Sequence, residues 1–340
     1  MGDRPKSSEG QGDKLDIRIV ADRGMCVVGL RTELYLQVMK QLTGNPSKES
    51  YLKGWEILCI ISNCFAPPLH LAMIVRQFLE KQAFSQEKVT ELLTDLKWKK
   101  LEGAALENAK LGLMAKYALQ KFKHTVKTPK GRVPSVEEIE HFCEAPFKLN
   151  VFGEALENIM LNPQNVDTSS RLPRVLSFLA EAVLLLGGHA SEGIFRVPGD
   201  LDGIIALRMR IERGNYDLEG IHDAAVPASL LKMWVRELEE PLIPTKFYTR
   251  CLQISQVQAA MDVVDELPQL NRSCIKYLAK YLQLVGDPVN QPKTKMSVSN
   301  LAIVFAPNLL RCPADNPLVI LQNSKAEQKF VKIIVNYLDE

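Results

Sequence analysis

The sequence predicts an all-α protein with two helical domains. Apolar residues recur at three- and four-residue intervals along most of the 340 residues, and Gly- or Pro-containing breaks separate these periodic segments. No long segment alternates apolar and polar residues as a half-buried strand would. The chain is 46% hydrophobic and 24% charged, which is typical of globular proteins, and its length suits two domains.

The first half is predicted to begin with a disordered leader and to continue as helices. Residues 1–24 are rich in Gly, Ser, Asp and Lys, with a possible strand over 15–20. Ser135 and Glu138 have the spacing of a capping box, so a short helix is expected after the Pro- and Gly-containing loop over 128–135. The preceding helices are expected over 30–43, 51–64, 69–79, 86–96 and 102–123.

The second half follows a break at Pro146 and is again helical in pattern. Its helices are separated by short breaks that contain Gly, Pro or Asn. We expect helices over 173–186, 200–213, 227–238, 244–255, 256–266, 271–285, 297–305 and 326–338.

Composition and motifs exclude several classes of function. The seven cysteines are scattered without a C-x-x-C pair, which argues against a disulfide framework or a zinc site and favours a reducing compartment. The five histidines lack metalloprotease spacing, and no G-x-x-x-x-G-K-[ST] loop is present to bind GTP. No segment is apolar enough to span a membrane. We therefore expect a cytoplasmic protein that needs no cofactor of its own, and association with the cytoskeleton is the further location to test.

Five polar residues are candidates for a functional site. Arg196 lies in Ser191–Asp200, a turn-rich run where a long cation can point outward. Lys232 and Arg236, four residues apart on an expected helix, lie roughly opposite its apolar stripe. The amides of Asn300 and Asn308 bracket another apolar helix.

Each candidate also has an ordinary structural interpretation. Loop arginines are usually solvated surface charges, and a Lys/Arg pair on one helix face is usually solvated too. Asn300 could cap its helix, and Asn308 could make a turn after Pro307. The residues by themselves leave both interpretations open.

Three blocks in the second half resemble the Rho GTPase-activating (RhoGAP) domain. They are Gly193-Ile194-Phe195-Arg196, Leu230-Leu231-Lys232 followed by Arg236-Glu237-Leu238, and Asn300-Leu301-Ala302 with Pro307-Asn308-Leu309. The resemblance covers about 150–340 and implies a RhoGAP-type helical bundle. It implies that Arg196 enters the active site of a GTP-bound Rho-family GTPase as an arginine finger. Lys232, Arg236, Asn300 and Asn308 would then bind the GTPase or position the finger, and GTP and magnesium would belong to the partner.

The first half resembles the myosin-tail homology 4 (MyTH4) domain. The matching residues include Arg31-Thr32-Glu33-Leu34-Tyr35, Gly54-Trp55, Phe65-Ala66-Pro67 and Gly131-Arg132-Val133-Pro134-Ser135. We expect this domain over 25–145, incomplete at its N-terminal side, because the segment before the first motif is a polar leader. A MyTH4 domain joined to a RhoGAP domain resembles the C-terminal part of Vilse/CrossGAP-type proteins, which implies Rac-like substrates.

The net charge of +2 conceals a basic region in the first domain. It has four interpretations: a solvated helix face, a surface for an acidic partner such as microtubules, a surface for anionic membrane, or, least favoured, a nucleic-acid surface without a recognised module. An alternative to the activator function is a catalytically silent adaptor that binds GTPases and cytoskeleton. The basic region holds two glutamates and ten basic residues: Lys97, Lys99, Lys100, Lys110, Lys116, Lys121, Lys123, Lys127, Lys130 and Arg132.

Overall fold

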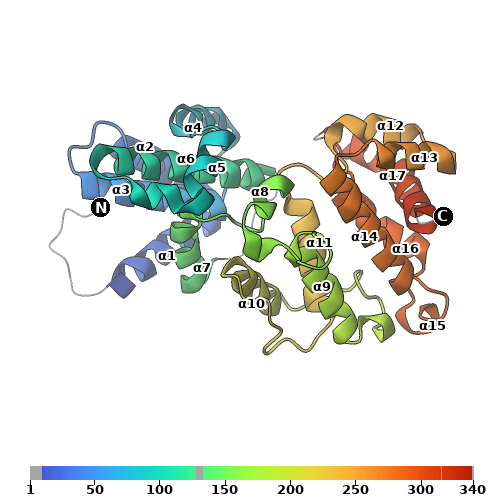
Figure 1. Cartoon of the computed structure of the whole chain (residues 1–340). Helices are drawn as coiled ribbons and strands as arrows, with labels where there is room; N and C mark the ends of the chain where they lie inside the picture. The colour runs from blue at the N-terminus through green and yellow to red at the C-terminus, as the bar shows by residue number, and fades with distance from the viewer. Residues whose placement is uncertain (1–9, 128–132, 315, 339–340) are drawn as a thin grey trace. The chain divides into compact units, whose positions relative to one another are not determined.

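The computed structural model describes residues 10–127, 133–314 and 316–338. All secondary-structure elements in these ranges are helical (Figure 1), apart from an isolated β-bridge between Val166 and Pro173. The all-α prediction is therefore confirmed. The chain divides into two compact units, Met1–Leu149 (unit 1) and Asn150–Glu340 (unit 2).

Unit 1 is built around helix α3, which packs most extensively against α6. Trp55 of α3 is fully buried and stacks on Phe78 of α4 with ring centroids 5.9 Å apart. The predicted capping box is confirmed: Ser135 accepts a hydrogen bond from the Glu138 N–H, and the Glu138 carboxylate accepts one from the Ser135 N–H. The elements are α1 (Gly10–Cys26), α2 (Val28–Gln41), α3 (Lys48–Cys64), α4 (Leu69–Gln82), α5 (Gln86–Leu93), η1 (Thr94–Lys100), α6 (Gly103–Lys127), α7 (Val136–Glu144) and η2 (Ala145–Phe147).

Helix α1 corrects the prediction of a disordered leader for residues 10–24, while residues 1–9 lie outside the described residues. Residues 10–24 are helical, and the possible strand over 15–20 is wrong. Ala21 is fully buried, Ile17 packs against the core of unit 1, and Arg18 Nε donates to the Pro134 carbonyl oxygen over 3.2 Å. Tertiary contacts thus stabilise a helix whose own sequence has little apolar periodicity, as is common for helices in proteins.

Unit 2 has a core formed by several long helices around α11, which packs against α9, α10 and α16. Trp234 of α11 is fully buried, and its indole N–H donates to the Val151 carbonyl oxygen over 3.0 Å. The elements are α8 (Leu156–Met160), η3 (Pro163–Asn165), α9 (Arg174–Leu185), η4 (Gly188–Ala190), α10 (Leu201–Glu212), α11 (Ala225–Glu237), η5 (Thr245–Phe247), α12 (Tyr248–Gln253), α13 (Val257–Asp265), α14 (Gln269–Val285), α15 (Gln291–Thr294), α16 (Val298–Leu309) and α17 (Pro317–Tyr337).

Two predicted helices are longer in the structure than in the sequence pattern. Helix α16 continues past Phe305 and contains Pro307, and α17 begins nine residues before Ala326. These first nine residues of α17 make about two and a half turns, and none of them is buried, so the segment has no buried stripe that would give it apolar periodicity. Apolar periodicity predicts only those helical segments that bury one face, so it did not predict this exposed segment.

Candidate functional site

Arg196 lies on a tight turn between η4 and α10, and its side chain is exposed, which confirms the predicted loop. The backbone N–H groups of Arg196 and Val197 both donate to the Gly193 carbonyl oxygen over 2.8 Å. Gly193 has a φ of +70° and donates its own N–H to the Thr294 carbonyl oxygen over 2.7 Å. Glycine suits this left-handed position, and a Cβ there would lie 2.9 Å from a Val197 methyl group.

Phe195 anchors the turn in the core of unit 2. Its side chain is fully buried and packs edge-to-face on Phe305 and Tyr281, with ring centroids 5.0 and 6.1 Å away. Its φ of +68° is a left-handed conformation that costs a non-glycine residue about 1–3 kcal/mol. The aromatic packing offsets this cost. As a result, Phe195 points inward while the next residue, Arg196, points into solvent.

Lys232 of α11 forms a hydrogen bond to the same turn. Its Nζ donates to the Phe195 carbonyl oxygen, and the side chain is half-buried. Burial lowers the pKa of Lys232, and the nearby Arg236 guanidinium lowers it further. The interpretation of Lys232 as a solvated charge is therefore wrong, whereas Arg236, one turn further along, is exposed.

The far end of the loop is fixed to α11 as well. The Gly199 N–H donates to Ser229 Oγ over 3.0 Å, and a Cβ on Gly199 would lie 2.6 Å from the backbone of Ala225. Asp200 then caps α10, because its Oδ2 accepts the Gly203 N–H over 2.8 Å. Both ends of the arginine loop are thus attached to helices of the core.

Asn300 supports the turn that receives Gly193. Its Nδ2 donates to the Lys295 carbonyl oxygen over 3.0 Å, and the preceding residue, Thr294, is the one that accepts the Gly193 N–H. The N-cap of α16 is Ser297, not Asn300, because Ser297 Oγ accepts the Asn300 N–H. The structure therefore brings Asn300 into the hydrogen-bonded support of the Arg196 loop.

Asn308 does not join this support. It lies inside α16 and not in a turn after Pro307, so that prediction is wrong. Its side chain is only 6% exposed, and its Nδ2 donates to the Val304 carbonyl oxygen of its own helix over 2.7 Å. Pro307 has no N–H, so α16 lacks the backbone hydrogen bond that residue 307 would otherwise donate to the carbonyl oxygen four residues earlier. The Asn308 side-chain amide donates to the next carbonyl oxygen along the helix, that of Val304.

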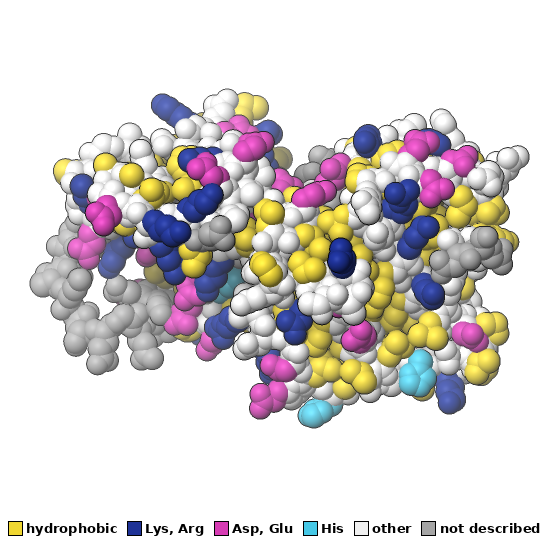
Figure 2. All heavy atoms as spheres, viewed as in Figure 1, with side chains coloured by type: hydrophobic (Ala, Val, Ile, Leu, Met, Phe, Trp, Pro, Cys, Tyr) yellow, Lys and Arg dark blue, Asp and Glu magenta, His cyan; other side chains and the backbone are white. Residues whose placement is uncertain are grey.

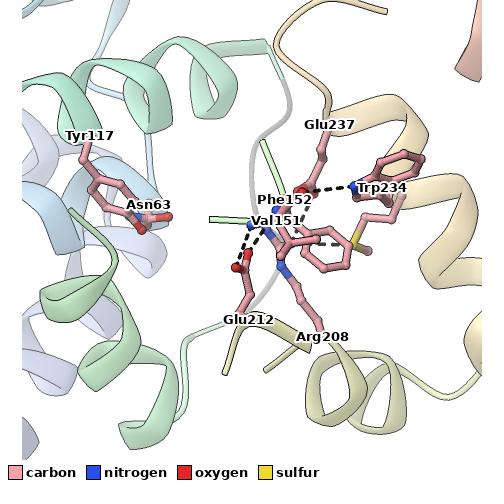
Figure 3. A network of polar contacts seen from close by, with 9 residues as sticks. Asn63, Tyr117, Val151, Phe152, Arg208, Glu212, Trp234 and Glu237 are labelled. Atoms are coloured by element: carbon pink, nitrogen blue, oxygen red, sulfur yellow. Dashed lines mark hydrogen bonds and ion pairs between the residues drawn. The ribbon is translucent and has the colours of Figure 1, made fainter. Parts of the chain in front are cut away.

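A polar network fastens the first residues of unit 2 to the helices of the site (Figure 3). The Glu212 carboxylate at the end of α10 accepts the Val151 and Phe152 N–H groups over 2.9 and 3.1 Å. Arg208, one turn earlier on α10, pairs with Glu237 of α11 over 2.9 Å, and its guanidinium lies 4.8 Å from the centre of the Phe152 ring. The network therefore holds α10 and α11, the two helices attached to the arginine loop, in one relative position.

Sequence reasoning missed several residues of this support. Thr294 acts through a backbone carbonyl oxygen, for which no side-chain signal exists. Arg311 donates to the Arg236 and Leu238 carbonyl oxygens, each over 2.8 Å, and so satisfies the last carbonyls of α11. Ser229 and Glu212 are ordinary helix-surface residues in the sequence, and only their long-range partners distinguish them.

The basic residues of unit 1 are dispersed over its surface. Lys110 and Lys116 are six residues apart on α6, about 240° around the helix, so they point to different sides. Lys123 lies 3.9 Å from Glu80, and Figure 2 shows acidic side chains among the basic ones on the visible face of this unit. Within the described part of the basic region, three exposed lysines lie within four positions on η1: Lys97, Lys99 and Lys100. The side chain of Lys127, and Lys130 and Arg132, lie outside the described residues.

Among the described residues, no cluster of His, Cys, Asp and Glu has the arrangement of a metal site. Likewise, no helix in the described ranges combines the length and apolar character needed to cross a membrane.

Comparisons with known proteins give matches to both units. Residues 18–141 match the family model of the MyTH4 domain, and residues 173–314 match that of the RhoGAP domain. The chain is 32% identical to GTPase activating protein homolog 3 of Dictyostelium discoideum over 222 residues, which are 65% of this chain and 17% of that protein. It is 30% identical to Rho GTPase-activating protein 22 of Mus musculus over 213 residues, 59% of this chain and 29% of that protein.

One solved structure extends these matches to the fold. The crystal structure of human Rho GTPase activating protein 15 aligns with 61% of this chain and 98% of its own length, with a TM-score of 0.51 and 26% identity. The matched part of our chain spans less than a third of each curated relative named above.

Proposed function

Because this chain carries a MyTH4 domain followed by a RhoGAP domain, we propose that unit 2 accelerates GTP hydrolysis by a Rho-family small GTPase. In this proposal the chain is not an enzyme by itself, since GTP and magnesium are held by the partner. Arg196 completes the partner's active site from outside, as an arginine finger.

The observation that carries the proposal is the anchored backbone of the Arg196 loop. The loop is anchored by the buried Phe195 ring, by Lys232 and by the Gly193 bond to Thr294, while the Arg196 side chain is exposed. A guanidinium is planar, permanently charged and a multiple donor, so it suits the negative charge that develops on phosphoryl oxygens in the transition state. Because the loop backbone is already fixed, only the Arg196 side chain has to be ordered when it acts.

The other candidates divide into two roles. Lys232 and Asn300 act as positioning residues, because their side chains bond to the loop and to the turn that supports it. Arg236 is exposed near Lys232 and is proposed to contact the GTPase directly. Asn308 is buried against its own helix, so we propose that it maintains α16.

Single-turnover GTP hydrolysis with a panel of Rho-family GTPases tests the proposal. Arg196→Ala should lower stimulated hydrolysis by about 10³- to 10⁵-fold while the variant still binds the GTP-loaded partner. Arg213→Ala is a matched control, because Arg213 is also an exposed arginine of unit 2 but lies at the far end of α10. Full stimulation by Arg196→Ala would refute the finger.

The same panel addresses substrate preference and the adaptor alternative. Rac-like GTPases are proposed as the favoured substrates, and a rate ranking across the panel decides this point. If the unmutated chain binds GTP-loaded GTPases without accelerating any of them, the silent adaptor replaces the activator.

For unit 1 we propose an acidic cytoskeletal partner, with microtubules as the candidate to test. The supporting observation is the exposed group Lys97, Lys99 and Lys100 on η1. Cosedimentation of the full chain with microtubules should weaken as salt rises and should weaken further when these three lysines are changed to Gln. An absence of pelleting at low salt would eliminate this partner.

A further inference from the structure

Helix α17 has an exposed face that none of the functions proposed above uses. It begins with Leu318 and Leu321, which are 68% and 71% exposed, and continues with Lys325, Lys329 and Lys332, all exposed. The intervals of three and four residues place all five side chains on one side of the helix. From Leu318 to Lys332 this face, which we call the α17 face, is about 21 Å long.

The opposite side of α17 holds the helix in unit 2. Phe330, Val331 and Ile334 are buried there, and the buried carboxyl of Glu327 accepts a hydrogen bond from the Tyr248 hydroxyl. The α17 face is therefore directed away from the core by the same packing that fixes the helix. Its leucines are too exposed to contribute to the stability of unit 2.

The charge of the α17 face is positive and uncompensated. Its lysines form no ion pair with any carboxylate in the described part of the chain. Helices α12, α13, α14 and α16 pack against α17, and of these only α13 carries carboxylates.

Those α13 carboxylates are engaged elsewhere. Asp265 lies 3.9 Å from Arg272, and Glu266, which follows the helix, pairs with Arg250 over 2.7 Å. Asp262 accepts a hydrogen bond from Gln258 on its own helix over 3.0 Å. The three lysines therefore present a positive row to whatever approaches α17.

We propose that the α17 face docks unit 2 onto an anionic phospholipid surface. The two leucines would enter the boundary between headgroups and acyl chains, and the lysines would lie along the surface with their ammonium groups at lipid phosphates and carboxylates. A straight row of flexible cations with apolar residues at one end matches a fluid, negatively charged plane. Binding to a folded acidic protein would call for fixed hydrogen-bonding partners, and the α17 face offers few. The docking is independent of the proposed GTPase activation, because α17 carries none of the candidate site residues.

Vesicle flotation with the full chain tests the inference. Phosphatidylcholine vesicles containing about a third phosphatidylserine should bind the chain, and pure phosphatidylcholine vesicles should not. Each lysine near an anionic surface contributes roughly a fivefold factor in binding, so changing Lys325, Lys329 and Lys332 together to Gln should lower binding by about a hundredfold. Changing Leu318 and Leu321 to Gln should lower it by about tenfold, because the apolar insertion is lost.

A matched control comes from α14, where Lys276 and Lys280 are also exposed, four residues apart on a helix of the same unit. Changing these two to Gln should leave binding within about twofold, and all variants should retain the circular dichroism spectrum of the parent. Equal binding to neutral and anionic vesicles would overturn the proposal. Loss of binding only with the α14 pair, or only with Lys97, Lys99 and Lys100, would overturn it as well, since the membrane contact would then lie elsewhere.

Discussion

Unit 1 and unit 2 differ in how their candidate polar residues are distributed in the fold. In unit 1, the described basic side chains between Lys97 and Lys123 are spread over η1 and different sides of α6, with acidic neighbours such as Glu80 among them. In unit 2, Arg196, Lys232 and Asn300 are separated by dozens of residues, yet Lys232 donates to the Arg196 loop and Asn300 donates to the turn that accepts the Gly193 N–H. The density of charge along a sequence therefore says little about a site, whereas hydrogen bonds between distant segments bring the residues of the candidate site together.

The sharpest way to test this difference is to remove the bond between Lys232 and the arginine loop. Lys232→Met keeps the aliphatic stem but leaves the Phe195 carbonyl oxygen without its charged donor. A hydrogen bond to a charged group is worth about 1.5–3 kcal/mol, so stimulated hydrolysis should fall about 10- to 100-fold. The fall should appear in kcat more than in KM, since the finger is displaced while the binding surface remains. Lys280→Met, on an exposed part of α14, should have no such effect; equal rates for both variants would contradict the positioning role.

A second test concerns the network at the start of unit 2. Glu212→Gln preserves the shape of the side chain but places an amide where two backbone N–H groups of Val151 and Phe152 need an acceptor. The free energy of unfolding should drop by about 1–3 kcal/mol. Chemical denaturation measures the drop, and single-turnover hydrolysis with the folded variant shows whether α10 and α11 still hold the loop. A variant as stable as the parent would mean that the network contributes nothing.

The buried pair Tyr248 and Glu327, 79 residues apart, predicts a pH dependence of stability. Burial raises the pKa of Glu327 above its ordinary value of 4.5. A group with a raised folded-state pKa stabilises the folded protein most below its unfolded pKa, and this contribution is lost as the pH rises through the folded pKa. The loss amounts to about 1.4 kcal/mol for each unit by which the pKa is raised. Denaturation between pH 4 and 8 should show this decline in the parent and a flatter profile in Glu327→Gln, and parallel profiles would refute it.

The smallest effect is expected where unit 1 carries its exposed lysines. Changing Lys97, Lys99 and Lys100 to Gln should alter the activation free energy of stimulated hydrolysis by no more than about 0.5 kcal/mol, because the residues are solvated. The free energy of unfolding should change by no more than the same amount. The same triple variant should still weaken microtubule cosedimentation if the proposal for unit 1 holds. A large loss of hydrolysis would show that unit 1 contributes to the site after all.

Most helices could be predicted from the sequence because their signals are local. Apolar stripes predicted α3, α9, α11 and α14. The spacing of Ser135 and Glu138 predicted the N-terminal cap of α7, which the structure confirms. The failures lie where tertiary contacts or exposure replace periodicity. Helix α1 is stabilised by the buried Ala21 and by the Arg18 bond to Pro134, and the start of α17 has no buried face.

By itself, the sequence determined an all-α chain of two domains, a turn-rich loop that exposes Arg196, and the order of the motifs that identify the domains. These properties follow from helical periodicity, turn residues and motif spacing, which act over a few neighbouring positions. Only the tertiary structure decided that Phe195 adopts a left-handed conformation with its ring in the core, that Lys232 bonds to its carbonyl oxygen, and that Asn308 turns inward. Those outcomes depend on which distant groups meet in the folded chain, because a buried polar group takes the partner that packing brings within reach.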